Sequence, residues 1–228
     1  MADITSGLVA HWKLDETSGA VAADSSGNGY TGTYVNTPTL GEAGAFGSSK
    51  AVTFASASSQ YISFGSKAAP ASMTVAFWQK FTSASGTQRP FHYGRTLISI
   101  ATNGVVITWF SDTAGSFVNW TVSALGTTNF RHIAITQTGT TAILYIDGVS
   151  QGSKTISAAI NTAANNSFVA CYNGASQFIN ASLDDVRIYS RALSAGDVAA
   201  LYAYTGEKYY NLYTELYPAQ LPCGLFHN

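Results

Sequence analysis

The chain has 228 residues and a net charge of −1, and only 10% of its residues are charged. This balance supplies no positive field for nucleic acid or an anionic membrane surface, so neither is expected as a partner. The apolar runs are too short to span a membrane, so no membrane insertion is expected. The chain is long enough to bury a sizeable core without disulfides or metals.

The N-terminal sequence MADITSGLVAHWKLDE has no basic segment followed by an apolar stretch. We therefore expect no signal peptide, and synthesis in the cytoplasm. Cys171 and Cys223 cannot build a disulfide framework, and free thiols are favoured over a single bridge.

Short apolar and aromatic runs, separated by Gly, Ser, Thr, Asn and Asp, predict many short strands. In chain order, the expected strands are residues 9–14, 51–54, 61–64, 73–81, 95–100, 105–110, 117–122, 131–137, 142–146, 167–172 and 178–189. Asp147-Gly148 after AILYI predicts a tight turn, because such turns need positive φ at both central residues. The segment SDTAG predicts a longer hairpin loop between Phe110 and Ser116.

One helix is expected near the C-terminal end of this region. Ser194 with Asp197 three residues later resembles a capping box, and Val198, Leu201 and Tyr202 then form a short apolar face. Many strands and one helix predict an all-β protein, a two-sheet antiparallel β-sandwich with one short C-terminal helix.

The chain divides into a domain, residues 1–204, and a C-terminal tail, residues 205–228. A free tail is normally poor in aromatics, but this tail contains several, so we expect it to pack either on its own domain or on a neighbouring subunit. The candidate assembly residues are Tyr209, Tyr210, Tyr213, Tyr217 and Phe226.

The sequence SLDDVRIYSRALS places Asp184 beside Asp185. In a regular strand, successive side chains point to opposite faces, so Asp184 is expected on the core side with Val186 and Ile188. Asp185 is then expected on the solvent side, where it forms a weak surface pair with Arg187. Two carboxylates on opposite faces cannot flank one glycosidic bond, which argues against a catalytic pair.

The loop ADSSGNGYTGT offers hard oxygen ligands suited to Ca²⁺, including those of Asp24 and Asn28. The alternative is an Asx-turn without metal, in which Asp24 accepts from its own backbone. A carboxylate on the core side, as expected for Asp184, also needs donors or a cation.

Four separated segments carry a resemblance to a known family: GLVAHWKLDETSGAVAADSSGNGYTGT, AVTFASASSQYISFG, HIAITQTGTTAILYIDG and SLDDVRIYSRALSAGDVAALY. Over about residues 7–202 the chain resembles the laminin-G-like, concanavalin A-like lectin/glucanase jelly-roll domains. The resemblance implies two antiparallel sheets packed face to face, with the first and last parts of the domain adjacent. It also favours Ca²⁺ as a structural cofactor, with Asp24, Asn28 and Asp184 as candidate ligands, although the usual Phe-Asp-Gly is here Phe54-Ala55-Ser56.

Some relatives of this fold are glycoside hydrolases with acidic residues alternating along one strand, but no Glu-x-Asp-x-Glu run occurs here. The sequence also has no Gly-x-Ser-x-Gly, no phosphate-binding loop and no His/Cys metal spacing. We therefore expect no enzymatic activity.

Exposed aromatics and orienting polar groups are what a glycan-binding site needs. The candidate ligand-binding residues are His92, Tyr93 and Arg95 in RPFHYGR, and Trp109 in the following hairpin. If Phe110 pairs with Ser116, Trp109 and Trp120 fall on opposite faces and form no common platform. The alternative for these aromatics is ordinary core packing.

Two functions follow from these features. The first is a non-enzymatic domain that binds carbohydrate or a cell surface, and it rests on analogy of fold. The alternative is a structural virion protein, such as a phage decoration or tail-associated subunit, that assembles with neighbouring subunits through residues 205–228 and is displayed on the particle.

Overall fold

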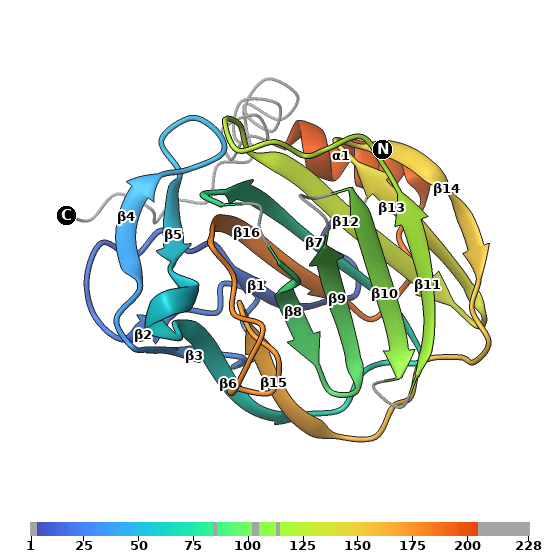
Figure 1. The fold of residues 1–228 in the computed structure, drawn as a ribbon. Coiled ribbons are helices and arrows are strands. Elements are labelled where there is room, and N and C mark those ends of the chain that lie inside the picture. The colour runs from blue at the N-terminus through green and yellow to red at the C-terminus, as the bar shows by residue number, and fades with distance from the viewer. Residues whose placement is uncertain (1–3, 84–85, 102–104, 113–114, 205–228) are drawn as a thin grey trace, which may run out of the picture.

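The computed structural model describes residues 4–83, 86–101, 105–112 and 115–204, and these form two packed β-sheets with one α-helix (Figure 1). The elements are β1 Leu8–Trp12, β2 Val21–Ala22, β3 Gly32–Val35, β4 Thr39–Ala43, β5 Lys50–Phe54, a 3₁₀ turn Ser56–Ser58, β6 Tyr61–Lys67, β7 Ser72–Phe81, β8 Gln88–Tyr93, β9 Thr96–Ala101, β10 Val106–Asp112, β11 Ser116–Thr121, β12 Arg131–Thr138, β13 Thr141–Ile146, β14 Val149–Thr155, β15 Asn165–Val169, β16 Ala181–Tyr189 and α1 Ala195–Ala203.

Each sheet has eight strands, and every strand pairing is antiparallel. The front sheet, nearer the viewer in Figure 1, has the order β11-β10-β9-β8-β15-β6-β3-β2. The back sheet has the order β14-β13-β12-β7-β16-β5-β4, with β1 paired to β16. This pairing of the first and last strands confirms the expected adjacency of the two ends of the domain and the expected β-sandwich.

The main core lies between the two sheets. Its largest fully buried side chains include Trp12, Phe54, Phe77, Phe91 and Trp109. Burial of aromatic surface of this extent is the dominant favourable contribution to such a fold.

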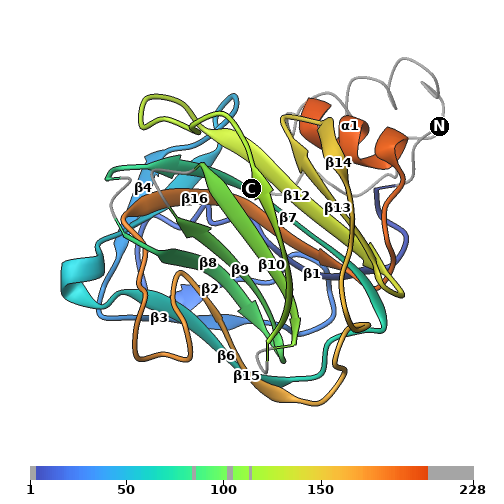
Figure 2. The ribbon, with the colours of Figure 1, turned by 45° about the vertical axis from the view of Figure 1, so that its right-hand side comes forward.

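The helix α1 covers the outer side of the back sheet, beside β13 and β14 (Figure 2). Its N-terminus has the predicted capping box: the Ser194 hydroxyl accepts from the Asp197 N–H, and the Asp197 carboxylate accepts from the Ser194 N–H. Val198 and Leu201 bury a second, smaller apolar cluster against the sheet. The ring of Tyr202 stacks on Trp78 of β7, with centroids 5.5 Å apart.

The β13–β14 connection is the predicted tight turn. Asp147 and Gly148 have φ of 51° and 77°, as this turn type requires. The Asp147 carboxylate accepts from the His132 N–H at 2.9 Å, which ties the turn to β12.

The strand β16 departs from the regular alternation that the sequence predicted. Asp184 pairs with Trp78 and Arg187 pairs with Ala76, so the intervening Asp185 and Val186 stand opposite a single residue of β7. Asp185 has a φ of 52°, which marks the bulge in the backbone.

The bulge reverses the faces expected for the residues before it. Asp184 shares the outer side of the back sheet with its partner Trp78, whereas Val186 and Ile188 belong to the core between the sheets. The prediction that Asp184 faces the core with Val186 and Ile188 was therefore wrong. The prediction of a surface pair was also wrong, because Asp185 and Arg187 are 5% and 3% exposed.

The β10–β11 hairpin has a register one residue away from the one considered from the sequence. Phe110 pairs with Phe117, not with Ser116, and Ile107 pairs with Trp120. Trp109 and Trp120 consequently lie on the same side, both in the core, since a shift of one residue moves a side chain to the other face.

Candidate functional site

The outer face of the front sheet carries a band of aromatic side chains across β8, β10 and β11. Phe110 and Phe117 are cross-strand partners whose ring centroids lie 5.2 Å apart. Phe117 is 48% exposed, and Phe110 is half-buried. These two rings, tilted by 40° to each other, present an apolar surface on the outer face of the sheet.

A guanidinium group continues this band. The Arg89 side chain at the start of β8 lies over the ring of Tyr172, 4.5 Å from its centroid, and over the ring of Phe110, 5.3 Å from its centroid. Burial lowers the pKa of Arg89, and Tyr172 opposes this shift. We call Phe110, Phe117, Arg89, Tyr172 and His92 the aromatic strip.

His92 forms the floor of the strip under the segment that follows β15. Its ring stacks on Tyr172 with centroids 5.3 Å apart, and its Nδ1 accepts from the Asn173 N–H at 3.3 Å. Burial lowers its pKa to about 4, with a further contribution from Arg89. His92 is therefore neutral near pH 7 and acts as packing for the strip.

The structure separates the four ligand-binding residues predicted from the sequence. His92 lies in the strip, but it is only 1% exposed. Tyr93 and Trp109 lie in the core between the sheets, 1% and 0% exposed, so a glycan cannot stack on either ring. Arg95 is half-buried in the β8–β9 turn, and its Nε has no hydrogen-bond partner within the described residues.

The strip residues that the sequence analysis missed are Arg89, Phe110, Phe117 and Tyr172. The alternation along RPFHYGR could have placed one member of the strip. If Phe91 and Tyr93 point into the core, His92 between them must point to the outer face of the sheet. The contact of Tyr172 with Arg89 depends on a loop that returns over the sheet, and no local pattern predicts that placement.

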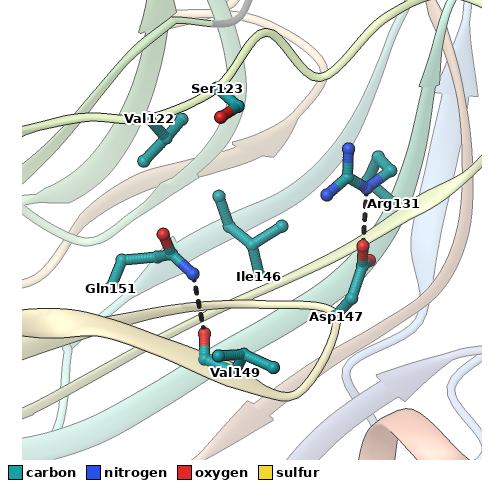
Figure 3. A pocket seen from close by; sticks show the side chains of 7 residues that line it. All are labelled: Val122, Ser123, Arg131, Ile146, Asp147, Val149 and Gln151. Carbon is teal, nitrogen blue, oxygen red and sulfur yellow. Dashed lines mark hydrogen bonds and ion pairs between the residues drawn. The ribbon is translucent and has the colours of Figure 1, made fainter.

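A separate cavity of about 290 Å³ lies where the β13–β14 turn meets the segment between β11 and β12 (Figure 3). Its lining residues are Val122, Ser123, Arg131, Ile146, Asp147, Val149 and Gln151. The Arg131 Nε donates to Asp147 Oδ2 at 2.6 Å along one wall. This cavity is small for a ligand pocket, and its one cation is already paired.

The loop proposed to hold calcium is organised by hydrogen-bond donors. Asp24 Oδ1 accepts from the N–H groups of His11 and Ser26, and its Oδ2 accepts from the Ser26 hydroxyl and the Tyr30 N–H. The Asn28 amide donates to the carbonyls of Leu8 and Val9.

A calcium site needs converging oxygens, whereas N–H and O–H groups surround Asp24. Asp184 makes its contacts elsewhere, with the Ala45 N–H and the Ser49 hydroxyl. Across the described ranges, no group of three or more His, Cys, Asp or Glu could hold a metal ion. These residues do not fit a calcium ion at Asp24, and they favour the Asx-turn.

Asp184 anchors the loop between β4 and β5 from the outer side of the back sheet. Its Oδ2 accepts from the Ala45 N–H at 2.8 Å and from the Ser49 hydroxyl at 2.9 Å. Burial, and to a smaller extent Asp185, raise its pKa to about 7 against the effect of these bonds.

Asp185 forms a buried network with His11 and Arg187. Its Oδ1 lies 2.6 Å from His11 Nε2 and 3.0 Å from both Arg187 Nε and Nη2. Burial opposes ionisation, but Arg187 and the His11 hydrogen bond lower the pKa of Asp185 to about 2. Arg187 in turn lies 4.7 Å from the ring centroid of Tyr204.

The sequence predicted that Asp184 and Asp185 lie on opposite faces of the strand and so cannot form a catalytic pair. That reason was wrong, because the bulge places both aspartates on the outer side of the back sheet. Both carboxylates are nevertheless buried, Asp184 to 1% and Asp185 to 5% exposure. Asp184 contacts Ala45 and Ser49, Asp185 contacts His11 and Arg187, and neither carboxylate lines the cavity of Figure 3.

The candidate assembly residues Tyr209, Tyr210, Tyr213, Tyr217 and Phe226 lie outside the described residues, as does Cys223. Cys171 is a buried free thiol whose pKa is raised to about 12 by burial. In the part of the chain that is described, no helix has the length and apolar character to cross a membrane.

Comparison with known proteins identifies a family and several similar structures. The family model for the concanavalin A-like lectin/glucanase superfamily matches residues 46–199. No match is found among curated proteins.

One similar structure is domain 4 of AbnA, an extracellular arabinanase from Geobacillus stearothermophilus, in complex with arabinotriose. It is 21% identical with a TM-score of 0.65, and the match covers 85% of this chain and 97% of that domain. The binding domain of Paraclostridial Mosquitocidal Protein 1 is 19% identical with a TM-score of 0.64, and the match covers 92% of this chain and 54% of that one. Trypanosoma rangeli sialidase is 12% identical with a TM-score of 0.61, and the match covers 89% of this chain and 33% of that one. These identities show a shared fold, and the fold occurs in proteins named both as enzymes and as binding domains.

Proposed function

The chain belongs to the concanavalin A-like lectin/glucanase superfamily, and from this membership and the aromatic strip we propose that it is a non-enzymatic domain that binds carbohydrate, including glycans of a cell surface. The observation that carries the proposal is the pair of the exposed Phe117 and the half-buried Phe110, with Arg89 against the Phe110 ring. Sugar rings stack on aromatic faces, and a neighbouring guanidinium supplies donors to hydroxyl groups.

The similar structures support this proposal by their named ligands and roles. Domain 4 of the arabinanase was solved with arabinotriose, and the mosquitocidal protein domain is named a binding domain. The arabinanase is also named extracellular, and we place the action of this domain outside the cell on the same analogy.

The buried state of Asp184 and Asp185 supports a non-catalytic role, because a catalytic carboxylate must reach the substrate. Incubation with arabinan, xylan, pectin and sialylated glycans, followed by measurement of released reducing sugar or sialic acid, tests this part. Release that is abolished in Asp184→Asn would overturn it.

A glycan array followed by calorimetric titration of the best ligand tests the binding proposal. Phe117→Ala is expected to weaken binding by about fivefold to tenfold, because one stacking face is lost. Gln151→Ala, in the cavity of Figure 3, is the matched control and is expected to leave the affinity unchanged. A loss confined to Gln151→Ala would move the site to that cavity, and no binding to any glycan would refute the proposal.

The alternative function, a virion subunit assembled through residues 205–228, is favoured by the aromatic composition of that segment. Light scattering of the full chain and of a chain ending at Tyr204 tests it. A defined oligomer that the shorter chain does not form would support assembly through the tail, and two monomers would contradict it.

A further inference from the structure

Arg89 differs from the arginines that form ion pairs in this protein. Arg131, Arg187 and Arg191 each have a nitrogen within 3.0 Å of an aspartate oxygen. Arg89 has no ion pair with any carboxylate in the described ranges, and its buried Nε has no hydrogen-bond partner there.

The position of Arg89 makes this lack of a partner costly. Its guanidinium lies against the rings of Tyr172 and Phe110 and is half-buried. The rings attract the charge but accept no conventional hydrogen bonds from its N–H groups. A partly desolvated cation gains most from an anionic acceptor, and because the Nε is buried, a ligand would reach this one through its Nη groups.

The ion pairs of the described residues contain no carboxylate partner for Arg89. Asp112, at the end of β10, accepts from the Asn161 amide at 2.9 Å. Two influences act on the pKa of Arg89: burial lowers it and Tyr172 raises it. No carboxylate is among them. An acidic ligand would therefore meet a positive charge that the strip does not neutralise internally.

We propose that the aromatic strip selects acidic glycans, in which a sugar carboxylate or sulfate accepts from Arg89 while the sugar ring stacks on Phe110, Phe117 or Tyr172. This inference rests on the proposed function and specifies its ligand class. The planar guanidinium matches the geometry of a carboxylate or sulfate edge, and the aromatic faces on either side hold the ring that carries it.

The experiment compares matched ligands that differ only in the acidic group. The probes are the trimer of galacturonic acid with its methyl ester, 3′-sialyllactose with lactose, and a sulfated with an unsulfated N-acetyllactosamine. Titration of the full chain at low salt is expected to show at least one acidic member bound about tenfold or more tightly than its neutral partner. Added NaCl is expected to weaken binding of the acidic member only.

Variants assign this preference to one residue. Arg89→Gln is expected to remove the acid preference while neutral binding persists, and Arg89→Lys to restore it in part, because lysine keeps the charge without the fork. Arg95→Gln removes a guanidinium whose Nε also has no hydrogen-bond partner in the described residues, and it is expected to keep the preference. Thermal unfolding of each variant establishes that it is folded.

The outcomes separate this inference from the function on which it rests. Equal binding of acidic and neutral partners by the wild type, with no effect of salt, would refute acid selection and leave carbohydrate binding standing. The same preference in Arg89→Gln as in the wild type would refute the role of Arg89. A preference for the carboxylates or for the sulfated probe identifies which acid is accepted, and no binding to any probe or array glycan would remove the proposed function itself.

Discussion

Asp184 and Asp185 are adjacent in the chain, yet their surroundings shift their pKa values in opposite directions. Asp184 has two neutral donors, and burial raises its pKa to about 7. Asp185 has the charged Arg187 and a His11 hydrogen bond, which lower its pKa to about 2 despite burial. At the scale of single residues, a charged partner decides whether a buried carboxylate stays ionised.

The raised pKa of Asp184 predicts a pH-dependent stability. Between pH 4 and 7 the folded protein holds this proton more tightly than the unfolded chain, so its contribution is lost as pH rises through about 7. Asp184→Asn has no proton to lose. We expect the unfolding free energy of Asp184→Asn, relative to the wild type, to increase from pH 5 to pH 8 in urea titrations.

Ser49→Ala provides a test of opposite sign. It removes a donor to Asp184, which favours the ionised carboxylate, so its destabilisation should be larger at pH 8 than at pH 5. Differences from the wild type that stay constant across this range, in both variants, would contradict the assigned role of Asp184.

Two ion pairs in the molecule allow the effect of burial to be measured. Asp185→Asn leaves Arg187 buried without its counter-charge, and we expect a loss of about 3 kcal/mol of unfolding free energy. Asp147→Asn removes the partner of the half-buried Arg131 and keeps a residue that tolerates positive φ, so a loss below about 1 kcal/mol is expected. Equal losses in urea unfolding would show that burial does not decide the difference.

At the scale of elements, α1 closes the outer side of the back sheet. Its capping box satisfies backbone donors at the N-terminus, and its apolar face contacts the sheet. We expect Ser194→Ala to cost about 1 kcal/mol and to speed hydrogen exchange in α1. Ser194→Asp, which keeps an acceptor, is the control and should stay close to the wild type; equal losses in both variants would contradict the capping role.

Elements with a strong local signal could be predicted from the sequence. The Asp147-Gly148 turn and the Ser194 cap follow from residues a few positions apart, and the structure contains both. The faces of β16 could not be predicted, because the bulge at Asp185 adds a residue that alternation does not reveal. The register of the β10–β11 hairpin was missed by one residue, which was enough to misplace Trp120 relative to Trp109.

The candidate site was harder to predict than the fold for the same reason. The aromatic strip joins Arg89 of β8 to Tyr172, which lies far away in sequence, in a loop after β15. Their contact depends on tertiary packing, so a reading of RPFHYGR alone selected Tyr93, whose ring is in the core. Composition and motifs indicated the family, whereas the aromatic strip could be found only from the positions of both loops and strands.

At the scale of the whole molecule, the two outer faces of the sandwich differ in how far they are covered. The back sheet is covered by α1, while the front sheet leaves Phe117 exposed and Arg89, Phe110 and Tyr172 partly exposed. Each face also contains a buried neutral histidine, His132 on the back sheet and His92 on the front. Burial lowers the pKa of both to about 4.

These histidines predict the acid response of the molecule. Between pH 6.5 and 4 the unfolded chain binds protons that the folded His92 and His132 do not, so stability falls as pH falls through this window. Asp184 contributes in the opposite direction, but one group is outweighed by two whose shifts are of similar size. We therefore expect the urea midpoint of the wild type to be lower at pH 4.5 than at pH 6.5.

His132→Phe tests the assignment, since it keeps a ring against Trp78 and removes the group that titrates. Its urea midpoint should fall less than that of the wild type over the same interval. If the fall is equal in both proteins, His132 does not contribute to acid sensitivity. If the wild type gains stability towards pH 4.5, Asp184 outweighs both histidines. The aromatic strip, which His92 supports, would then be more stable in acid, together with the rest of the fold.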